Sequence, residues 1–226
     1  MWRKKKSMRW NTMGILAVGF LGVILSGGIL LWLPVCNRGS ISFIDALFTS
    51  VSSVCVTGLV TITPAAQFTL PGQVILLLLI QIGGLGVIAC VTAFFLLLRK
   101  RITVRERVVI QETYNMDSLG GMVGMVKRVI QGTLVVEGAG AILYAFQFIP
   151  EYGAARGIWY SVFHAVSAFC NAGIDILGES SLAGYVDNPI INLTTMMLII
   201  LSGIGFMVWF DVIGNGRKIL KKELPK

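Results

Sequence analysis

Four long runs of apolar residues constrain this chain more than any other feature of its sequence. An α-helix rises 1.5 Å per residue, so a run of about 20 residues crosses the roughly 30 Å hydrocarbon core of a bilayer. Only 13% of the residues are charged, against about 25% in a typical soluble domain. The sequence therefore predicts an all-α membrane protein with four transmembrane helices. The runs are Met13–Leu33, Gln73–Leu98, Val129–Ile149 and Pro189–Val212.

The basic residues predict how these helices are oriented. The segments 34–72 and 150–188 hold only Arg38 and Arg156. Because Lys and Arg accumulate on the cytoplasmic side of membrane proteins, both termini are expected in the cytoplasm. The same distribution explains the net charge of +8 without nucleic-acid binding, for which no motif is present. The remaining Lys and Arg residues lie in 1–12, 99–128 and 213–226, with 5, 7 and 5 of the total of 19.

Each of the two outer segments contains an apolar stretch that is too short to cross the bilayer. These stretches, Phe43–Val54 and Ile158–Phe169, have the length of a re-entrant helix, and each is followed at once by a turn that contains glycine. Irregular backbone survives at membrane depth only where it is buried in protein or lines a wet cavity. We therefore predict two re-entrant pore helices, each followed by a pore loop.

The chain also repeats itself. Residues 42–62 align with 157–177 at a shift of 115, and Gly84-Leu85-Gly86 aligns with Gly203-Ile204-Gly205 at a shift of 119. The first alignment pairs identical residues, among them Cys55 with Cys170. The predicted division is a basic cytoplasmic N-terminus 1–12, a first span–pore-loop–span repeat 13–98, a basic cytoplasmic linker 99–128, a second such repeat 129–213 and a basic cytoplasmic tail 214–226.

Two short segments have the composition of an ion-selectivity filter. Backbone carbonyls can replace the hydration shell of a potassium ion if several of them point at the pore axis. Turning successive carbonyls inward needs backbone conformations that glycine permits. Asp175, directly after the second segment, is a candidate vestibule carboxylate that would raise the local cation concentration. The two segments are Val56, Thr57, Gly58 and Leu59, and Asn171, Ala172, Gly173 and Ile174.

These loops resemble those of a known family. Residues Phe48–Leu59 are similar to the first pore loop of the Trk/Ktr/HKT potassium transporters, and Phe163–Gly173 to the second. Gln81–Gly86 and Ser202–Phe206 resemble the glycine-rich stretches of the spans that follow these loops. The resemblance covers nearly the whole chain and is closest to the N-terminal half of a Ktr-type membrane subunit.

The resemblance implies potassium uptake across a bacterial plasma membrane through a multi-pass pore. Family members carry four such repeats, and Gly58 stands where some sodium-selective plant relatives have serine. The resemblance also implies a homodimer in membrane lipid, a cytoplasmic RCK-type nucleotide-binding regulatory subunit, no cofactor, and sodium as a candidate coupling ion. Because only two repeats are present, we expect two missing repeats or a second copy to close the pore, and a chain that continues beyond Lys226.

Three other functions remain open. Two copies of the chain could form a self-sufficient two-repeat channel, or the chain could be a non-conducting membrane subunit. An intramembrane enzyme would use Ser161 and His164, three residues apart on one helical face. The rest of a catalytic site is missing from the sequence, so we expect no enzyme and no catalytic residues.

Several individual features have two interpretations each. Glu137 either pairs with a group in the missing half or lies near the inner interface because its helix begins later. His164 is expected to pack or to form a hydrogen bond behind the second loop. Gly83–Gly86 either let helices approach closely or bend the pore. The segment 104–128 either docks a cytoplasmic regulator or is an ordinary basic loop. The four cysteines, which lack metal or disulfide spacing, are expected to pack in the membrane.

Overall fold

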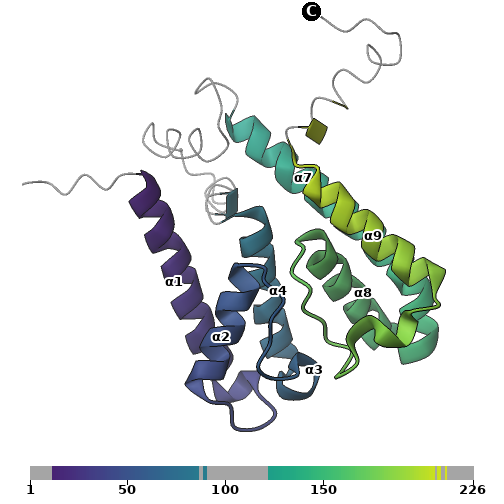
Figure 1. The fold of residues 1–226 in the computed structure, drawn as a ribbon, viewed down its shortest axis with the longest axis horizontal. Coiled ribbons are helices and arrows are strands. Elements are labelled where there is room, and N and C mark those ends of the chain that lie inside the picture. Colours follow the sequence, from purple (N-terminus) through teal and green to yellow (C-terminus); the bar gives the residue numbers. More distant parts are fainter. Residues whose placement is uncertain (1–11, 87–88, 91–121, 207, 210–211, 213–226) are drawn as a thin grey trace, which may run out of the picture.

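A computed structural model describes most of the chain (Figure 1). The described residues are 12–86, 89–90, 122–206, 208–209 and 212. The basic segments 1–11, 99–121 and 213–226, with most of the predicted docking face at 104–128, lie outside them. In chain order the elements are α1 Thr12–Trp32, η1 Pro34–Cys36, α2 Phe43–Val54, α3 Pro64–Gln67, α4 Leu70–Leu85, α7 Met122–Tyr152, α8 Ala154–Phe169, η2 Ser181–Tyr185 and α9 Pro189–Gly203.

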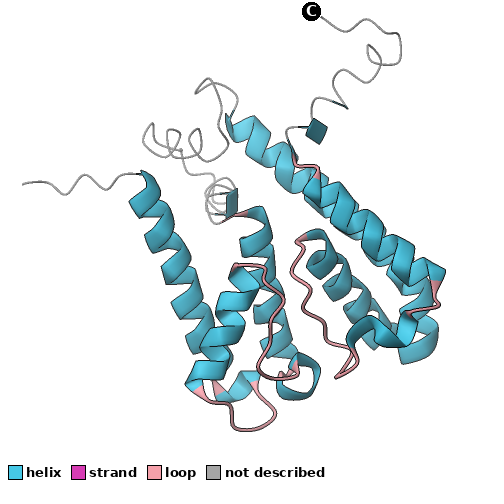
Figure 2. Cartoon of the chain, viewed as in Figure 1, coloured by secondary structure: helices cyan, strands magenta, loops and turns pink. Residues whose placement is uncertain are grey.

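The predicted all-α class is confirmed in the described part of the chain, which contains one isolated β-bridge and otherwise helices and loops (Figure 2). The helices form two groups with the same order. In the first group, α1 and α4 both pack against the shorter α2, and in the second group α7 and α9 both pack against α8 (Figure 1). The start of α1, the end of α4, the start of α7 and the end of α9 all lie at one end of the molecule.

The short helix α2 has the predicted bounds because its first turn is capped. Ser42 accepts a hydrogen bond from the backbone N–H of Asp45 at 3.1 Å, and its hydroxyl donates to the Asp45 carboxylate at 2.6 Å. This satisfies a backbone donor that a helix start leaves free. The second short helix, α8, begins four residues before the predicted Ile158, directly after Gly153 at φ +78°.

Two of the four apolar runs are not continuous helices, and the prediction was wrong on this point. Helix α4 ends at Leu85 and α9 at Gly203, with helix again at 89–90 and at 206. The physical reason is the left-handed backbone of Gly86, at φ +85°, and of Gly205, at φ +84°. These glycines are equivalent in the repeat, so both runs are interrupted at the same place.

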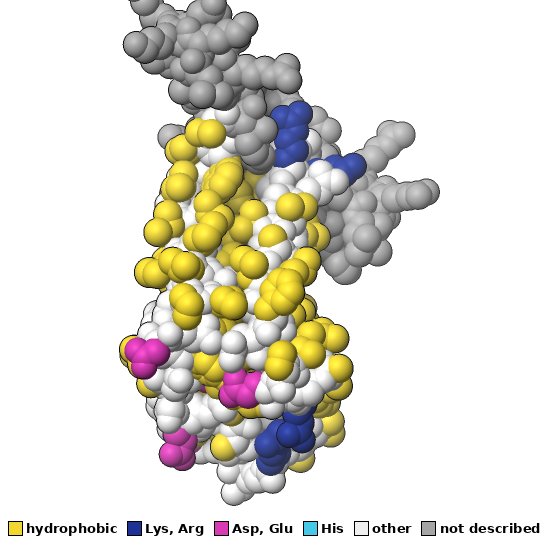
Figure 3. All heavy atoms as spheres, turned by 90° about the vertical axis from the view of Figure 1, so that its right-hand side faces the viewer, with side chains coloured by type: hydrophobic (Ala, Val, Ile, Leu, Met, Phe, Trp, Pro, Cys, Tyr) yellow, Lys and Arg dark blue, Asp and Glu magenta, His cyan; other side chains and the backbone are white. Residues whose placement is uncertain are grey.

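One helix in the described part, Gly124–Tyr152 within α7, is long and apolar enough by itself to cross a bilayer. The outward face of α7 and α9 is covered with apolar side chains, and charged side chains gather toward its two ends (Figure 3). Contiguous exposed apolar surface of this kind is typical of a contact with membrane or with another protein. Among its exposed residues are Leu134, Val135, Ile142, Phe146, Leu193, Met196, Met197 and Ile200.

Helix α4 connects the two groups because it touches the ends of both short helices. A Cβ atom on Gly83 would collide with the backbone carbonyl oxygen of Val54, the last residue of α2. A Cβ atom on Gly84 would collide with the side chain of Cys170, which directly follows α8. The interpretation of the glycine stretch as a site of close helix approach is confirmed at these two positions.

We expect Gly83→Ala to destabilise the protein by about 1–3 kcal/mol, because the added methyl group overpacks a contact with rigid backbone. Gly132→Ala on α7 is the matched control. Its Cβ atom would meet nothing within 4 Å, so its higher helix propensity should leave stability equal or better. Thermal unfolding of the two variants in detergent checks this difference, and equal midpoints would contradict it.

Candidate functional site

The two turns predicted to bind ions have the same backbone geometry. Each begins with a residue in the left-handed region, Val56 at φ +49° and Asn171 at φ +57°. Each continues to a glycine with positive φ, Gly58 at +74° and Gly173 at +65°. A β-branched residue such as valine rarely adopts this conformation, which costs of order 1–3 kcal/mol and persists only where the surroundings impose it.

Equivalent hydrogen bonds hold both turns on their helices. The backbone N–H of Thr57 donates to the carbonyl of Ser52 at 3.0 Å, and that of Ala172 donates to Ser167 at 2.8 Å. Each bond reaches back over the last turn of the preceding helix. The carboxyl ends of α2 and α8 therefore both lead directly into a turn of fixed shape.

The two turns meet, although 115 residues separate them in the sequence. A Cβ atom on Gly58 would stand 2.8 Å from the carbonyl oxygen of Ala172 and 3.6 Å from Cα of Gly173. Both turns lie between the two helix groups, on the inner side of α2 and α8 (Figure 1). Gly58 is thus fixed by two requirements at once, a positive φ and the absence of a side chain.

Side chains support the two turns differently. In the first turn, the hydroxyls of Ser52 and Thr57 bond to each other at 2.9 Å. In the second, the hydroxyl of Ser167 donates to the carbonyl of Ile174 at 2.5 Å and ties the chain beyond Gly173 back to α8. The side chain of Leu59 is 63% exposed, whereas that of Ile174 is 2% exposed. The second turn is therefore the more deeply packed of the two.

Two further contacts anchor the segments around the turns. The side-chain amide of Asn171 donates to the hydroxyl of Ser202, near the end of α9, at 2.8 Å. On the other side, hydrogen bonds from the hydroxyls of Ser42 and then Thr61 hold the pKa of the Asp45 carboxyl below its usual range. The Asn171 contact thus ties the second turn to a helix of its own group.

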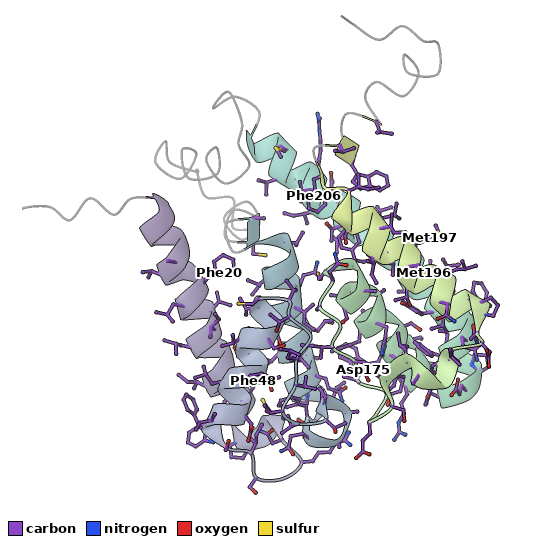
Figure 4. The ribbon with its side chains drawn as sticks, viewed as in Figure 1. Phe20, Phe48, Asp175, Met196, Met197 and Phe206 are labelled. Carbon is purple, nitrogen blue, oxygen red and sulfur yellow. The ribbon has the colours of Figure 1, made fainter. Side chains whose placement is uncertain are left out.

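Asp175 lies directly after the second turn and is half-buried in the space between the helix groups (Figure 4). Its Oδ1 atom accepts a hydrogen bond from the backbone N–H of Leu177 at 3.0 Å. This hydrogen bond holds the Asp175 carboxylate through Oδ1 and does not involve Oδ2. The predicted vestibule residue is thus next to the turn, in a defined orientation.

Glu137 lies in the middle of α7 and is 5% exposed. Because α7 begins at Met122, the interpretation that a later helix start places Glu137 near the inner interface is wrong. Its Oε1 atom accepts a hydrogen bond of 2.9 Å from the side-chain amide of Gln81 on α4. Sequence reasoning missed Gln81 as this partner, although an amide in the middle of an apolar run was the available signal.

The other polar side chains of interest form local contacts. His164 is buried, and its Nδ1 atom lies 2.7 Å from the carbonyl oxygen of Tyr160, which confirms the expected packing role. Ser161 donates to the carbonyl of Gly157 at 2.7 Å. Each thus bonds to the backbone of its own helix rather than to the other, and the arrangement is not that of a nucleophile and its base. Of the four cysteines, Cys55 beside the first turn is exposed, unlike the packing expected for it.

A family model and several known proteins are similar to this chain over most of its length. The family model described as TrkH, cation transport protein, matches residues 5–224. The potassium/sodium uptake protein NtpJ of Enterococcus hirae is 41% identical over 217 residues, which are 95% of this chain and 48% of that protein. The Ktr system potassium uptake protein B of Bacillus subtilis is 40% identical over 212 residues, 94% and 47% of the two chains. The chain thus spans about half the length of these relatives.

The Ser167–Ile174 bond predicts a local loss of order when it is removed. Ser167→Ala should leave the Ile174 carbonyl without its partner, at a cost of about 1–3 kcal/mol, and should speed amide exchange at residues 172–176. Ser161→Ala is the control, since this buried serine on the same helix bonds only within α8. Hydrogen–deuterium exchange of the purified variants measures the effect, which should be absent from the control.

Proposed function

Because this chain belongs to the TrkH cation transport family, whose members are transporters and not enzymes, we propose that it forms half of a potassium-uptake pore. The observation that carries the proposal is the meeting of two turns with the same left-handed backbone at Gly58 and Gly173. Nothing in ordinary helix packing needs such a contact, whereas a carbonyl-lined filter does. The membrane is the plasma membrane of a bacterium, as the bacterial relatives suggest.

In this mechanism the ion loses water to backbone carbonyls of residues 56–59 and 171–173. The carbonyl of Ile174, which the sequence also predicted for the filter, accepts a hydrogen bond from the buried Ser167 hydroxyl of α8 instead and supports the turn from behind. Glycine supplies the conformation that turns these carbonyls inward. Helices α2 and α8 add a second effect, because each ends directly before its turn. The carboxyl end of a helix carries partial negative charge, so both helices favour a cation at the turns. Potassium is the transported ion, with sodium as a coupling ion.

The arrangement of helix ends supports the finer membrane topology. The helices α1 and α7 cross the membrane, α4 and α9 cross it together with the residues beyond their glycine breaks, and α2 and α8 enter and return. Each segment rich in Lys and Arg is next in the sequence to a helix end, and these helix ends all lie at the same end of the molecule (Figure 1). That end is the cytoplasmic one, since positive charge accumulates there. Both chain ends given by the sequence then lie in the cytoplasm.

Two turns surround only part of an ion, so other repeats must complete the ring. The exposed side of the first turn, with Leu59 at 63% and Val60 at 43%, is available for them. The relatives are about twice as long as this chain, which favours two further repeats over a second copy. We further propose a dimer of complete pores in lipid, served by a cytoplasmic RCK-type nucleotide-binding subunit, since one relative is named as protein B of a Ktr system.

The pore proposal is tested by potassium uptake in bacteria that lack their own uptake systems. The chain is expressed alone, and also joined to the half of the Bacillus subtilis relative that it does not match. We expect the joined protein to restore growth at low potassium. Gly58→Ser should reduce potassium-over-sodium selectivity by about 10-fold or more, the equivalent of roughly 1.4 kcal/mol.

Gly39→Ser is the control for this substitution, because a Cβ atom on Gly39 would meet nothing within 4 Å. It should transport like the unmutated protein. Uptake by the chain alone would favour a dimeric two-repeat channel over the half-pore. A joined protein that inserts in the membrane but moves no potassium would refute the transport function.

The vestibule role of Asp175 predicts an effect that depends on ionic strength. Removing one charge about 10 Å from the ion path costs roughly 0.4 kcal/mol in water, so Asp175→Asn should raise the half-saturating potassium concentration about twofold in dilute buffer. The difference should fade in sodium-free buffers above about 0.1 M ionic strength, where screening is strong. Asp187→Asn, in the exposed segment before α9, is the control. An equal shift in both variants would assign the effect to general surface charge.

A further inference from the structure

A cavity of about 160 Å³, with a mostly apolar wall that carries several polar side chains, lies behind the second turn. It is lined by α7, α8, α9 and the segment that leads from Gly173 to η2, and it is partly open to the surface. The loop that carries Asp175, which lies between the two helix groups in Figure 4, contributes part of its wall. The polar residues in its wall include Tyr144, His164, Ser167, Asp175, Ser181 and Thr195.

His164 is the buried residue in this wall whose polar atoms are not all accounted for. The ring is 4% exposed and packs edge-on against Tyr144 and Phe148, at centroid distances of 6.3 and 5.4 Å. Its Nδ1 atom is 2.7 Å from the carbonyl oxygen of Tyr160. A carbonyl only accepts hydrogen bonds, so the proton is on Nδ1. The Nε2 atom is buried and has no hydrogen-bond partner among the described residues.

A buried acceptor without a donor is costly, by about 1–3 kcal/mol. No donor comes from the surrounding hydroxyls, since Tyr144 and Thr195 bond to each other at 2.6 Å and Ser167 donates to Ile174. The cavity can supply one. Water occupies about 30 Å³ in the liquid and binds in cavities that offer two to four polar partners. Nε2, the Asp175 carboxylate and the wall hydroxyls are such partners.

We propose that this cavity is a water site, in which water donates a hydrogen bond to Nε2 of His164 and bridges it to the segment Gly173–Asp175. His164 is thereby a positioning residue for the second turn. The first repeat has no counterpart, because Thr49 stands at the equivalent position and donates to the carbonyl of Asp45 at 2.8 Å. The two halves of the filter are therefore supported differently, the first by direct contacts and the second by direct contacts together with water.

His164 is the single histidine of the chain, so it can be observed alone. The protein is labelled with ¹⁵N-histidine, purified through a tag without histidine, and measured by solid-state NMR in lipid bilayers. We expect one neutral form with the proton on Nδ1, and fast magnetisation transfer from water to the ring. A proton on Nε2 would overturn the proposal, and so would transfer as slow as to the buried apolar core. A signal that changes with potassium or sodium concentration would show a bound cation in place of water and would also overturn it.

The consequence for ion selection rests on the proposed function and is measured in the joined transporter. His164→Gln, which can still accept a hydrogen bond, should stay within about threefold of the unmutated selectivity. His164→Leu should lose about 10-fold at equal membrane level. Thr49→Val, at the equivalent position of the first repeat, should retain selectivity. Equal selectivity of the Leu and Gln variants would overturn the positioning role. Failure of the unmutated protein to transport would instead refute the proposed function and leave the NMR result standing.

Discussion

The approach of the two turns to each other is the contact on which the rest of the structure depends. Gly58 lies so close to the Ala172 carbonyl that no side chain fits between them. Non-helical backbone of this kind carries polar groups that lipid cannot satisfy, so it must be enclosed by protein or water. The helices around each turn provide this enclosure. Each group has the same order of helices because each has one turn to cover.

Helix α4 joins the two helix groups. Its consecutive glycines Gly83 and Gly84 meet the end of α2 and the residue after α8, respectively. Because Cβ atoms are absent there, the carboxyl ends of both short helices can approach one helix. The position of one turn relative to the other is thus set by backbone packing, which is stiff. The Gln81–Glu137 hydrogen bond lies on the same helix and adds a polar contact to α7.

Sequence reasoning succeeded where the signal was local. The bounds of α2 followed from a short apolar stretch, and the family from motifs around Gly58 and Gly173, and the comparisons confirm that family. It failed where a feature depended on distant groups. The breaks at Gly86 and Gly205 were hidden in apolar runs, since hydropathy does not report φ. Neither the partner of Glu137 nor the cavity beside His164 could be predicted, because each is formed by helices that are far apart in the chain.

The sequence by itself determined the class of the protein, the twofold repeat and the positions of both turns. These are properties of composition and of short motifs, which act over one helix or one turn. Only the tertiary structure decided that the turns meet, that α4 holds both short helices, and that a cavity with His164 in its wall lies behind the second turn. The reason is that contacts across 115 residues depend on how whole helices pack, and apolar side chains specify helix formation far more clearly than they specify partners.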